Sequence, residues 1–460
     1  MLRTLDLSGT KVNMLPPWVT RASTLECLNL ENCSELVELP KDIGKLKWLE
    51  VLNIADCTKL LCLPSGIGQL TRLRQLGLFV VGCGGDDARI SELENLDMLS
   101  GEMVITNLKY VKDPCDAEKA CLKRKNRIQE LELNWSLSDT DKELAPNVEQ
   151  EQGVLSALEP PKQIMDLKIK GYRGTCFPWW MMKHNDSSYC EDTLSKQTSP
   201  CQFMSLTRLN LSYLPNLKHV RGLSEFPSLK FLTLWSMPKL EELRTTTGGF
   251  ETGEEALKAQ CCFPALYELS ILWWPKLLCV KPYFPPSLEQ LSLSAYDSLQ
   301  LLAPGNFFHP LRSTDESSSS CNVRSAVPHL RGLELIRMKA AASGWEYLQH
   351  HTELETLMIR HSDDLTQLSE SIRSLTSLWQ LWVFSCPALA KLLEWLGELR
   401  SLKELRVCDG TRIAGLPQSM KHLTSLVELA IGCGNNLDQL PDVIQHLTAL
   451  DCSPWKIVLQ

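Results

Sequence analysis

The chain has 460 residues and is mildly acidic, with 47 lysines and arginines against 55 aspartates and glutamates and a net charge of −8. That balance excludes a basic surface that covers the molecule and binds nucleic acid. The longest apolar run lies near residues 76–82 and is far too short to cross a membrane, so we expect no membrane span.

The 18 cysteines are scattered over the chain, and none of them forms a CxxC pair. This distribution is typical of free thiols rather than of disulfides or a zinc site. Free thiols persist in a reducing compartment, and the opening residues MLRTLDLSGTKV do not resemble a signal peptide. We therefore predict a cytoplasmic location.

Residues 1–98 consist of regular repeats. The motif LxxLxL starts at residues 2, 25, 49 and 73, and the segments LPKDIGKLKWL and LPSGIGQLTRL follow its second and third copies. Counted from the first leucine of the motif, positions 4 and 6 alternate as a strand requires, whereas positions 3, 5 and 7 point to solvent. The spacing of LPxxIxxL predicts a short helix or 3₁₀ turn after each strand.

A repeat of this length with an LxxLxL core is the signature of a leucine-rich repeat. One such unit cannot bury its apolar side alone, so units stack and their strands form a parallel sheet. We predict an α/β fold, a single leucine-rich-repeat domain over residues 1–460. It is a solenoid, a curved horseshoe with the parallel β-sheet on its concave face and short helices, 3₁₀ turns and loops on its convex face.

Residues 99–329 hold irregular repeats with insertions. Residues 99–108 form an off-pattern unit with core positions at Met103 and Ile105. A helix is predicted over 113–127, with Asp113 as N-cap and a solvated basic end formed by Lys123, Arg124, Lys125 and Arg127. The insertions are too poor in apolar residues to fold alone, and we expect loops there. They span residues 136–152, 183–202, 244–262 and 303–328.

Regular 24-residue repeats return over residues 330–449, and residues 450–460 depart from the pattern as the C-terminal end. Cys33, Cys57 and Cys386 all occupy position 9, where leucine-rich repeats usually carry asparagine. We expect these three side chains to be buried free thiols that meet the backbone of the turn.

The chain has no motif for catalysis, a cofactor or a metal. The P-loop, GxSxG, HExxH, GxGxxG and EF-hand patterns do not occur, and the nine histidines do not cluster at metal-ligand spacing. His361, Ser362 and Asp363 are the residue types of a catalytic triad, but a triad depends on geometry in space, and position 9 accounts for Ser362. We therefore expect no enzyme, no catalytic residue, no metal site and no cofactor.

Aromatic residues at the solvent-directed positions of strands are candidates for protein binding, because such positions are usually polar. The first group consists of Trp379, Trp382 and Phe384, with Met358, Arg360, Glu404 and Arg406 as neighbours on the same side of the predicted sheet. The second group consists of Tyr213, Trp235 and Trp273, close to the insertions. The alternative for both groups is that the rings pack under an insertion or against another domain.

Three stretches in the middle of the chain resemble a known family. They are DAEKACLKRKNRIQELELNW at 116–135, GVLSALEPPKQIMDLKIKGYRG at 153–174 and FPWWM at 177–181. These segments are similar to the leucine-rich-repeat region of plant intracellular nucleotide-binding disease-resistance proteins of the coiled-coil type. The likeness covers essentially the whole chain, because the C-terminal repeats are similar to that region as well.

The resemblance implies a non-enzymatic recognition domain of a plant innate-immune receptor. In that family the repeats sense pathogen effectors or guarded host proteins and restrain a nucleotide-driven switch. The expected partners are therefore a pathogen effector or a host protein and, in a full-length receptor, its nucleotide-binding domain. The switch itself is absent from these 460 residues, so no nucleotide site is carried over.

Two other interpretations stay open. In the first, the chain is a free-standing protein-binding repeat module, such as a substrate adaptor of a ubiquitin ligase. In the second, it is a truncated non-functional paralogue. An F-box-like helical segment before the repeats would favour the adaptor, and none precedes Leu2. An extracellular receptor would carry LxGxIP where this chain has LPxxIGxL.

Overall fold

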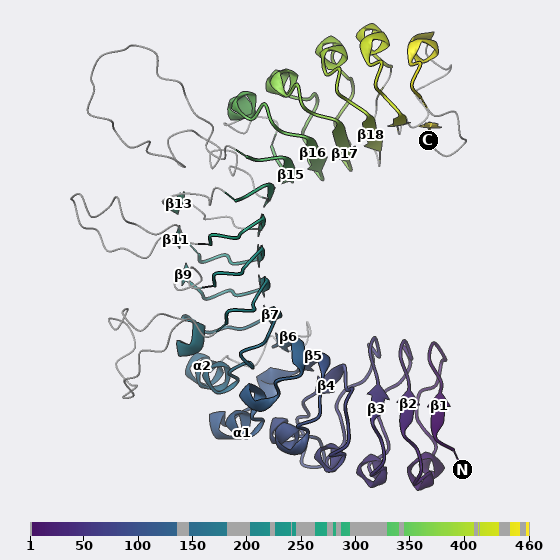
Figure 1. Ribbon diagram of the computed structural model, residues 1–460, viewed down its shortest axis with the longest axis vertical. Coiled ribbons are helices and arrows are strands. Elements are labelled where there is room, and N and C mark those ends of the chain that lie inside the picture. Colours follow the sequence, from purple (N-terminus) through teal and green to yellow (C-terminus); the bar gives the residue numbers. More distant parts are fainter. Residues whose placement is uncertain are drawn as a thin grey trace, which may run out of the picture. The chain divides into compact units, whose positions relative to one another are not determined.

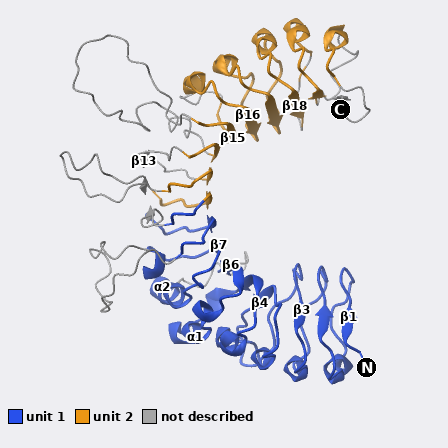
Figure 2. Cartoon of the chain, viewed as in Figure 1, with its two compact units in different colours: residues 1–229 blue, residues 230–460 orange. Residues whose placement is uncertain are grey.

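The computed structural model describes residues 2–135, 147–181, 203–220, 226–240, 242–244, 263–273, 279–281, 287–294, 329–339, 345–408, 413, 415–431, 442–450 and 457–459. The chain forms two compact units, Met1–Leu229 and Lys230–Gln460, which we call the N-terminal and C-terminal units (Figure 2). The boundaries between regular and irregular repeats, at 98/99 and 329/330, stay predictions.

In the N-terminal unit, parallel strands pair in the order of the repeats. Strands β1 to β3 form one ladder, and β4 to β8 form another. The strands are β1 (Thr4–Asp6), β2 (Cys27–Asn29), β3 (Val51–Asn53), β4 (Leu78–Val80), β5 (Gly101–Thr106), β6 (Ile128–Asn134), β7 (Asp166–Lys170), β8 (Arg208–Ser212) and β9 (His219–Val220).

The C-terminal unit follows the same rule. Strands β10, β12 and β14 to β20 pair in parallel, each with the strand of the next repeat. They are β10 (Phe231–Trp235), β12 (Glu268–Leu272), β14 (Gln290–Ser294), β15 (Gly332–Ile336), β16 (Thr356–Arg360), β17 (Gln380–Phe384), β18 (Glu404–Cys408), β19 (Glu428–Ile431) and β20 (Ile457–Leu459). The predicted leucine-rich-repeat fold with a parallel sheet is confirmed.

Within each unit the helical turns lie on the side away from the strands (Figure 1). Among the described residues two are α-helices, α1 (Pro114–Lys119) and α2 (Val148–Ala157). The described 3₁₀ helices of the N-terminal unit are Pro17–Arg21, Ile43–Lys45, Ile67–Gln69, Ile90–Asn95, Leu108–Tyr110, Leu122–Arg124 and Trp179–Met181. Those of the C-terminal unit are Trp345–His350, Glu370–Ser374, Glu394–Glu398, Gln418–His422 and Asp442–His446.

The leucines at position 4 form the core. From Leu28 to Leu429 each is at most 2% exposed, and those of β16 to β19 are Cα partners in adjacent strands. Leu5, in the first repeat, is half-buried, because the described chain packs against it from one side. Each leucine is therefore buried by its neighbours in the stack and not by its own repeat.

The position-9 thiols hydrogen-bond the backbone as expected. Cys33 donates to the carbonyl of Leu7 and Cys57 to that of Leu30, both over 3.1 Å, so each thiol links its repeat to the one before. All three predicted thiols are buried and free. Burial raises the pKa of the Cys57 thiol to about 11, which keeps the sulfur protonated and able to donate.

On the helical side, successive turns pack backbone against backbone. A Cβ added at Gly44 would lie 2.3 Å from the carbonyl oxygen of Gly66, and one at Gly397 would lie 2.2 Å from that of Ser419. The carboxylate of Glu394 accepts the backbone N–H of Ser419 over 2.9 Å, which holds the pKa of Glu394 below its usual value. Glycine permits the close approach, and the carboxylate satisfies an N–H group that the short helix leaves free.

The predicted helix over 113–127 is wrong in length. The N-cap is confirmed, since Asp113 accepts the backbone N–H of Cys115 over 2.9 Å. However, α1 ends at Lys119, because Cys121 adopts a left-handed conformation with φ 51° and a separate 3₁₀ turn follows. Lys125 is fully buried rather than solvated, and its Nζ donates to the carbonyl of Leu96 over 3.2 Å. Burial lowers the pKa of Lys125.

The first predicted loop is partly wrong. Residues 147–152 begin α2, whose Asn147 N-cap accepts the N–H of Gln150 over 3.1 Å. A buried ion pair joins this helix to the segment after β7, with 2.7 Å between Oε1 of Glu151 and a guanidinium nitrogen of Arg173. The other predicted loops, and residues 136–146 of the first, lie outside the described residues, except for Arg244 at the end of β11 (Glu242–Arg244).

Two local departures from the repeat were not predicted. In the repeat that starts at residue 73, Phe79 is buried at 0% and pairs with Ile105, whereas the predicted core residue Leu78 is half-buried. In the repeats that start at residues 229 and 266, a second short strand follows the main strand where a short helix or 3₁₀ turn was expected. These strands, β11 and β13 (Cys279–Lys281), pair in parallel with each other.

Leu405→Ala tests the repeat register. Because Leu405 is 0% exposed, we expect a loss of about 2–5 kcal/mol in the free energy of unfolding, with loosening of the adjacent repeats. Thermal and denaturant melts measure this loss, with Lys403→Ala at an exposed position as the control. Equal stability of the two variants would contradict the register.

Gly397→Ala tests the close approach on the helical side. The new Cβ would overlap the backbone of Ser419, so we expect the free energy of unfolding to fall by about 1–3 kcal/mol. Gly77→Ala is the matched control, because its Cβ would meet nothing within 4 Å and should change stability by less than about 0.5 kcal/mol. A chemical denaturation series that ranks the two variants in the opposite order would refute the packing argument.

Candidate protein-binding face

The strand face, meaning the side of the sheet to which positions 3, 5 and 7 point, carries the first predicted group in the C-terminal unit. Residues at the same position of neighbouring strands are Cα partners, so they line up in rows across the sheet. The position-5 row places Met358, Trp382 and Arg406 side by side, and the position-7 row places Arg360 beside Phe384. The register brings these five residues together, and their role in binding stays a prediction.

Trp382 is at the centre of this cluster. Its ring meets that of Phe384 edge to face, with centroids 5.9 Å apart and planes at 73°. The guanidinium carbon of Arg406 lies 4.7 Å from the centroid of Trp382. The indole Nε1 is buried and has no hydrogen-bond partner among the described residues. A half-buried tryptophan between an aromatic ring and a guanidinium has the composition of an interface hot spot.

The charged residues of the cluster are held by partners on the same face. Arg406 donates to Glu428 from Nε over 2.6 Å, and Gln380 donates to Glu404 over 2.8 Å. Arg360 donates to Glu334 over 3.1 Å. These contacts fix the orientation of the side chains around Trp382 before any partner arrives, which lowers the entropy that binding would cost.

Trp379 is not part of this cluster. It lies one residue before β17, where its carbonyl oxygen accepts the N–H groups of Lys403 and Glu404. Its side chain is half-buried at the entrance to the strand, whereas the ring of Trp382 contacts Phe384 and Arg406.

The second predicted group is divided between the units, with Tyr213 in the N-terminal unit and Trp235 and Trp273 in the C-terminal unit. Tyr213 and Trp273 both occupy position 8, where the backbone is left-handed with φ of 56° and 62°. Both rings are exposed and accompanied by cations, Lys170 at 6.0 Å and Arg337 at 4.1 Å from the ring centroids.

Sequence reasoning missed two members of the position-7 row. This row runs in register through Trp235, Leu272, Ser294, Ile336, Arg360 and Phe384. Leu272 and Ile336 are half-buried apolar residues between the two predicted groups. Comparing position 7 across all repeats, rather than searching for aromatic residues, would have found them.

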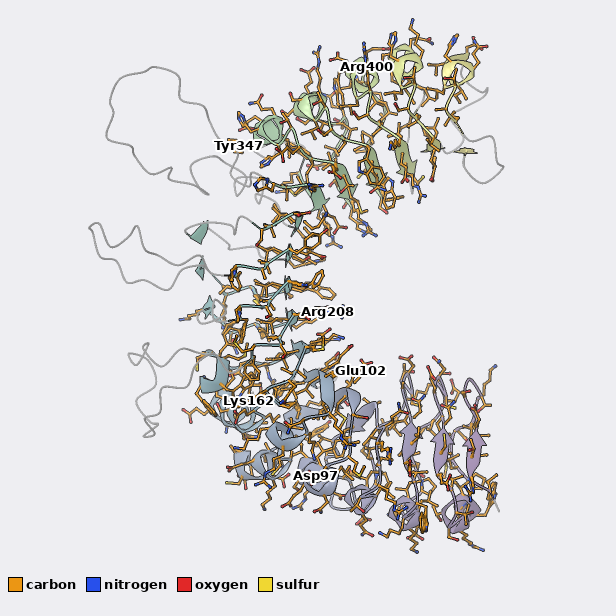
Figure 3. The ribbon with its side chains drawn as sticks, in the orientation of Figure 1. Asp97, Glu102, Lys162, Arg208, Tyr347 and Arg400 are labelled. Carbon is orange, nitrogen blue, oxygen red and sulfur yellow. The ribbon has the colours of Figure 1, made fainter. Side chains whose placement is uncertain are left out.

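The strand face of the N-terminal unit is charged instead. Glu102, Glu130 and Asp166 are Cα partners on adjacent strands, followed by Arg208 on β8, and Figure 3 labels Glu102 and Arg208. Arg208 Nε lies 3.3 Å from Oδ2 of Asp166, and burial raises the pKa of that carboxyl group. Among the described strands, the cluster around Trp382 and Phe384 thus lies on the C-terminal unit.

Within the residues that the structure describes, no three His, Cys, Asp or Glu side chains lie together so that they could hold a metal. Ser362, from the triad-like sequence, is fully buried and accepts the backbone N–H of Met338 over 3.1 Å. None of the described helices is long and apolar enough to span a membrane.

Comparison with known proteins confirms the resemblance stated from the sequence. Residues 90–237 match the family described as R13L1/DRL21 LRRs. The disease resistance RPP13-like protein 1 of Arabidopsis thaliana is 29% identical over 340 residues, which cover 65% of this chain and 31% of that protein. The disease resistance protein RGA4 of Solanum bulbocastanum is 33% identical over 227 residues, which cover 45% of this chain and 20% of that protein.

The chain therefore spans about a fifth to a third of the length of these relatives. Among solved structures, a leucine-rich-repeat protein of Leptospira interrogans is 17% identical with a TM-score of 0.44, over 98% of this chain and 95% of that one. At that score the likeness adds nothing to the strand pairing described above. These relatives carry the name of disease resistance proteins, and residues 90–237 match a leucine-rich-repeat family.

Trp382→Ala tests whether the ring is a surface anchor or a core residue. A half-buried ring that contacts Phe384 and Arg406 should contribute about 1 kcal/mol to the free energy of unfolding. Urea unfolding of the variant beside Leu405→Ala measures the difference. A loss of about 3 kcal/mol or more would identify Trp382 as a core residue and remove it as a binding anchor.

Proposed function

We propose that this leucine-rich-repeat chain, whose relatives are plant disease-resistance proteins, is the recognition part of a plant immune receptor. The strand face of the C-terminal unit binds a protein, which is either a pathogen effector or a host protein that an effector modifies. The observation that supports this most directly is the contact of the Trp382 ring with Phe384, edge to face, and with the guanidinium of Arg406.

The physical support comes from composition and from pre-organisation. Tryptophan and arginine are the residues that most often dominate the binding energy of protein interfaces. Arg406 is already held by Glu428 and lies over the ring of Trp382, so a partner meets a formed surface. The nearby pair of Arg360 and Glu334 adds polar groups that can restrict which partner fits.

The proposal includes a nucleotide-driven switch in another part of a longer receptor, which the repeats restrain. A protein that binds the face more tightly when the switch is released from the repeats would shift the switch toward its released state. In return, release of the switch would raise the affinity of the face for that protein by the same factor. We place this receptor in the cytoplasm, where the buried thiols of Cys33 and Cys57 remain reduced. The chain itself has no catalytic role in this proposal.

A pairwise interaction screen in leaf cells tests the proposal. The full chain is screened by split luciferase against a library of pathogen effectors and host immune proteins, as wild type and as Trp382→Ala. We expect at least one partner whose signal falls about tenfold or more in the variant, because a central tryptophan is lost from the interface.

Trp18→Ala is the matched control, since Trp18 is an exposed tryptophan in the N-terminal unit with 52% of its surface accessible. This variant should bind the same partner as the wild type does. Partners that bind Trp382→Ala and wild type equally well, or a library that contains none, would contradict the proposal.

A further inference from the structure

We propose that the partner presents an amphipathic α-helix, which lies across the strands of the C-terminal unit along the position-7 row. The inference rests on the proposed function and specifies the class of partner. The row consists of Trp235, Leu272, Ser294, Ile336, Arg360 and Phe384, one residue from each of β10, β12 and β14 to β17.

The row is mainly apolar although it belongs to the solvent-directed side of the strands. Trp235 is 36% exposed, and Leu272, Ile336 and Phe384 are half-buried. The charge of Arg360, which interrupts the row, is neutralised by Glu334 at 3.1 Å. Ser294 is buried, with 3% of its surface exposed, so apolar side chains stand on four of the six neighbouring strands. A partner whose own apolar residues form one stripe can meet these four.

The length of the row suits a helix. From Trp235 to Phe384 the row crosses five strand-to-strand steps of about 4.8 Å each, or about 24 Å in all. At 1.5 Å per residue, a helix of about 16 residues covers this distance, which is a common helix length. One helical turn of about 5.4 Å nearly matches one strand step, so each turn can place one apolar residue on one strand.

The width of the face suits a single helix as well. Each main strand from β14 to β18 is five residues long, so the face is about 13 Å wide at 3.3 Å per residue. A helix with its side chains is about 10–12 Å across. A second helix would lie beyond the strands and over the turns.

An extended segment suits the row less well. The backbone of β12 and β14 to β18 is paired with strands on both sides, so it offers no free edge to an added strand. An extended chain laid over Leu272 and Ile336 would turn its N–H and C=O groups toward apolar side chains. A helix satisfies these groups internally and avoids that cost.

Carboxylates at position 3, across the strand face from the row, favour basic residues on the flank of the helix that faces them. Glu404, on β18 and one strand beyond the row, accepts a hydrogen bond from the amide of Gln380 over 2.8 Å, and among the described residues no cation pairs with it. Glu268, at position 3 of β12, has a hydrogen bond from Ser270 over 3.5 Å. A lysine or arginine next to the apolar stripe of the helix would complement these carboxylates.

Displayed peptide libraries test this inference on the full chain. One library presents 18-residue helix-forming peptides with an apolar stripe at i, i+4, i+7, i+11 and i+14. A second has the same composition in an alternating, strand-forming order, and a third has the stripe over two turns only. We expect selection from the first library, with dissociation constants at least about tenfold weaker for Leu272→Ser and for Ile336→Ser.

A variant that is expected to bind more tightly distinguishes loss of a contact from loss of binding by misfolding. Arg360→Met replaces the charged residue of the row by an apolar one, so this variant should bind the selected helices more tightly than the wild type does. Trp18→Ala should leave binding unchanged, and thermal melts check that every variant is folded. Circular dichroism of the bound peptide should report a helix.

The outcomes separate the two proposals. If alternating peptides bind as well as helices, or if only Trp382→Ala weakens binding and the row variants do not, the helix is refuted and the protein-binding face stands. If none of these substitutions changes binding, both proposals are refuted.

Discussion

The structure depends on one constraint, which is that no repeat can bury its own leucines. A strand of two to seven residues presents a few aliphatic side chains to one side, and only the strands before and after it can cover them. The leucines of β16 to β19 meet as Cα partners for this reason. Stability is then a sum over neighbouring pairs, and the outward positions are left free to vary.

The same constraint explains where the chain accepts extra residues. Strands need only to remain neighbours, so additional chain can leave between them without breaking the ladder, as it does between β14 and β15. Where the helical side must pack backbone to backbone, glycine is required instead, as at Gly44 and Gly397. In the N-terminal unit, inserted residues contribute to α2, and the buried pair of Glu151 and Arg173 attaches this helix to the chain after β7.

Freedom at the outward positions has produced different chemistry in the two units. The N-terminal face carries Glu102, Glu130 and Asp166 in one row, whereas the C-terminal face carries a tryptophan, a phenylalanine and paired charges. The paired charges matter because they are neutralised before binding, so an apolar partner that covers them does not leave an unpaired ion buried. Recognition by such a face would depend on shape and apolar contact more than on net charge.

The sequence by itself determined the period of the repeat, the buried leucines, the position-9 thiols and the outward direction of Trp382 and Phe384, because these follow from local spacing. Tertiary structure decided the rest. The shift that buries Phe79, the burial of Lys125 and the early end of α1 depend on the space that adjacent repeats leave. The position-7 row could not be found from spacing along the chain, because insertions of unequal length separate Leu272 from Ile336. Strand pairing places these two residues on strands with only β14 between them. Local spacing fixes which side of a strand a residue faces, and only the stacking of repeats fixes its neighbours.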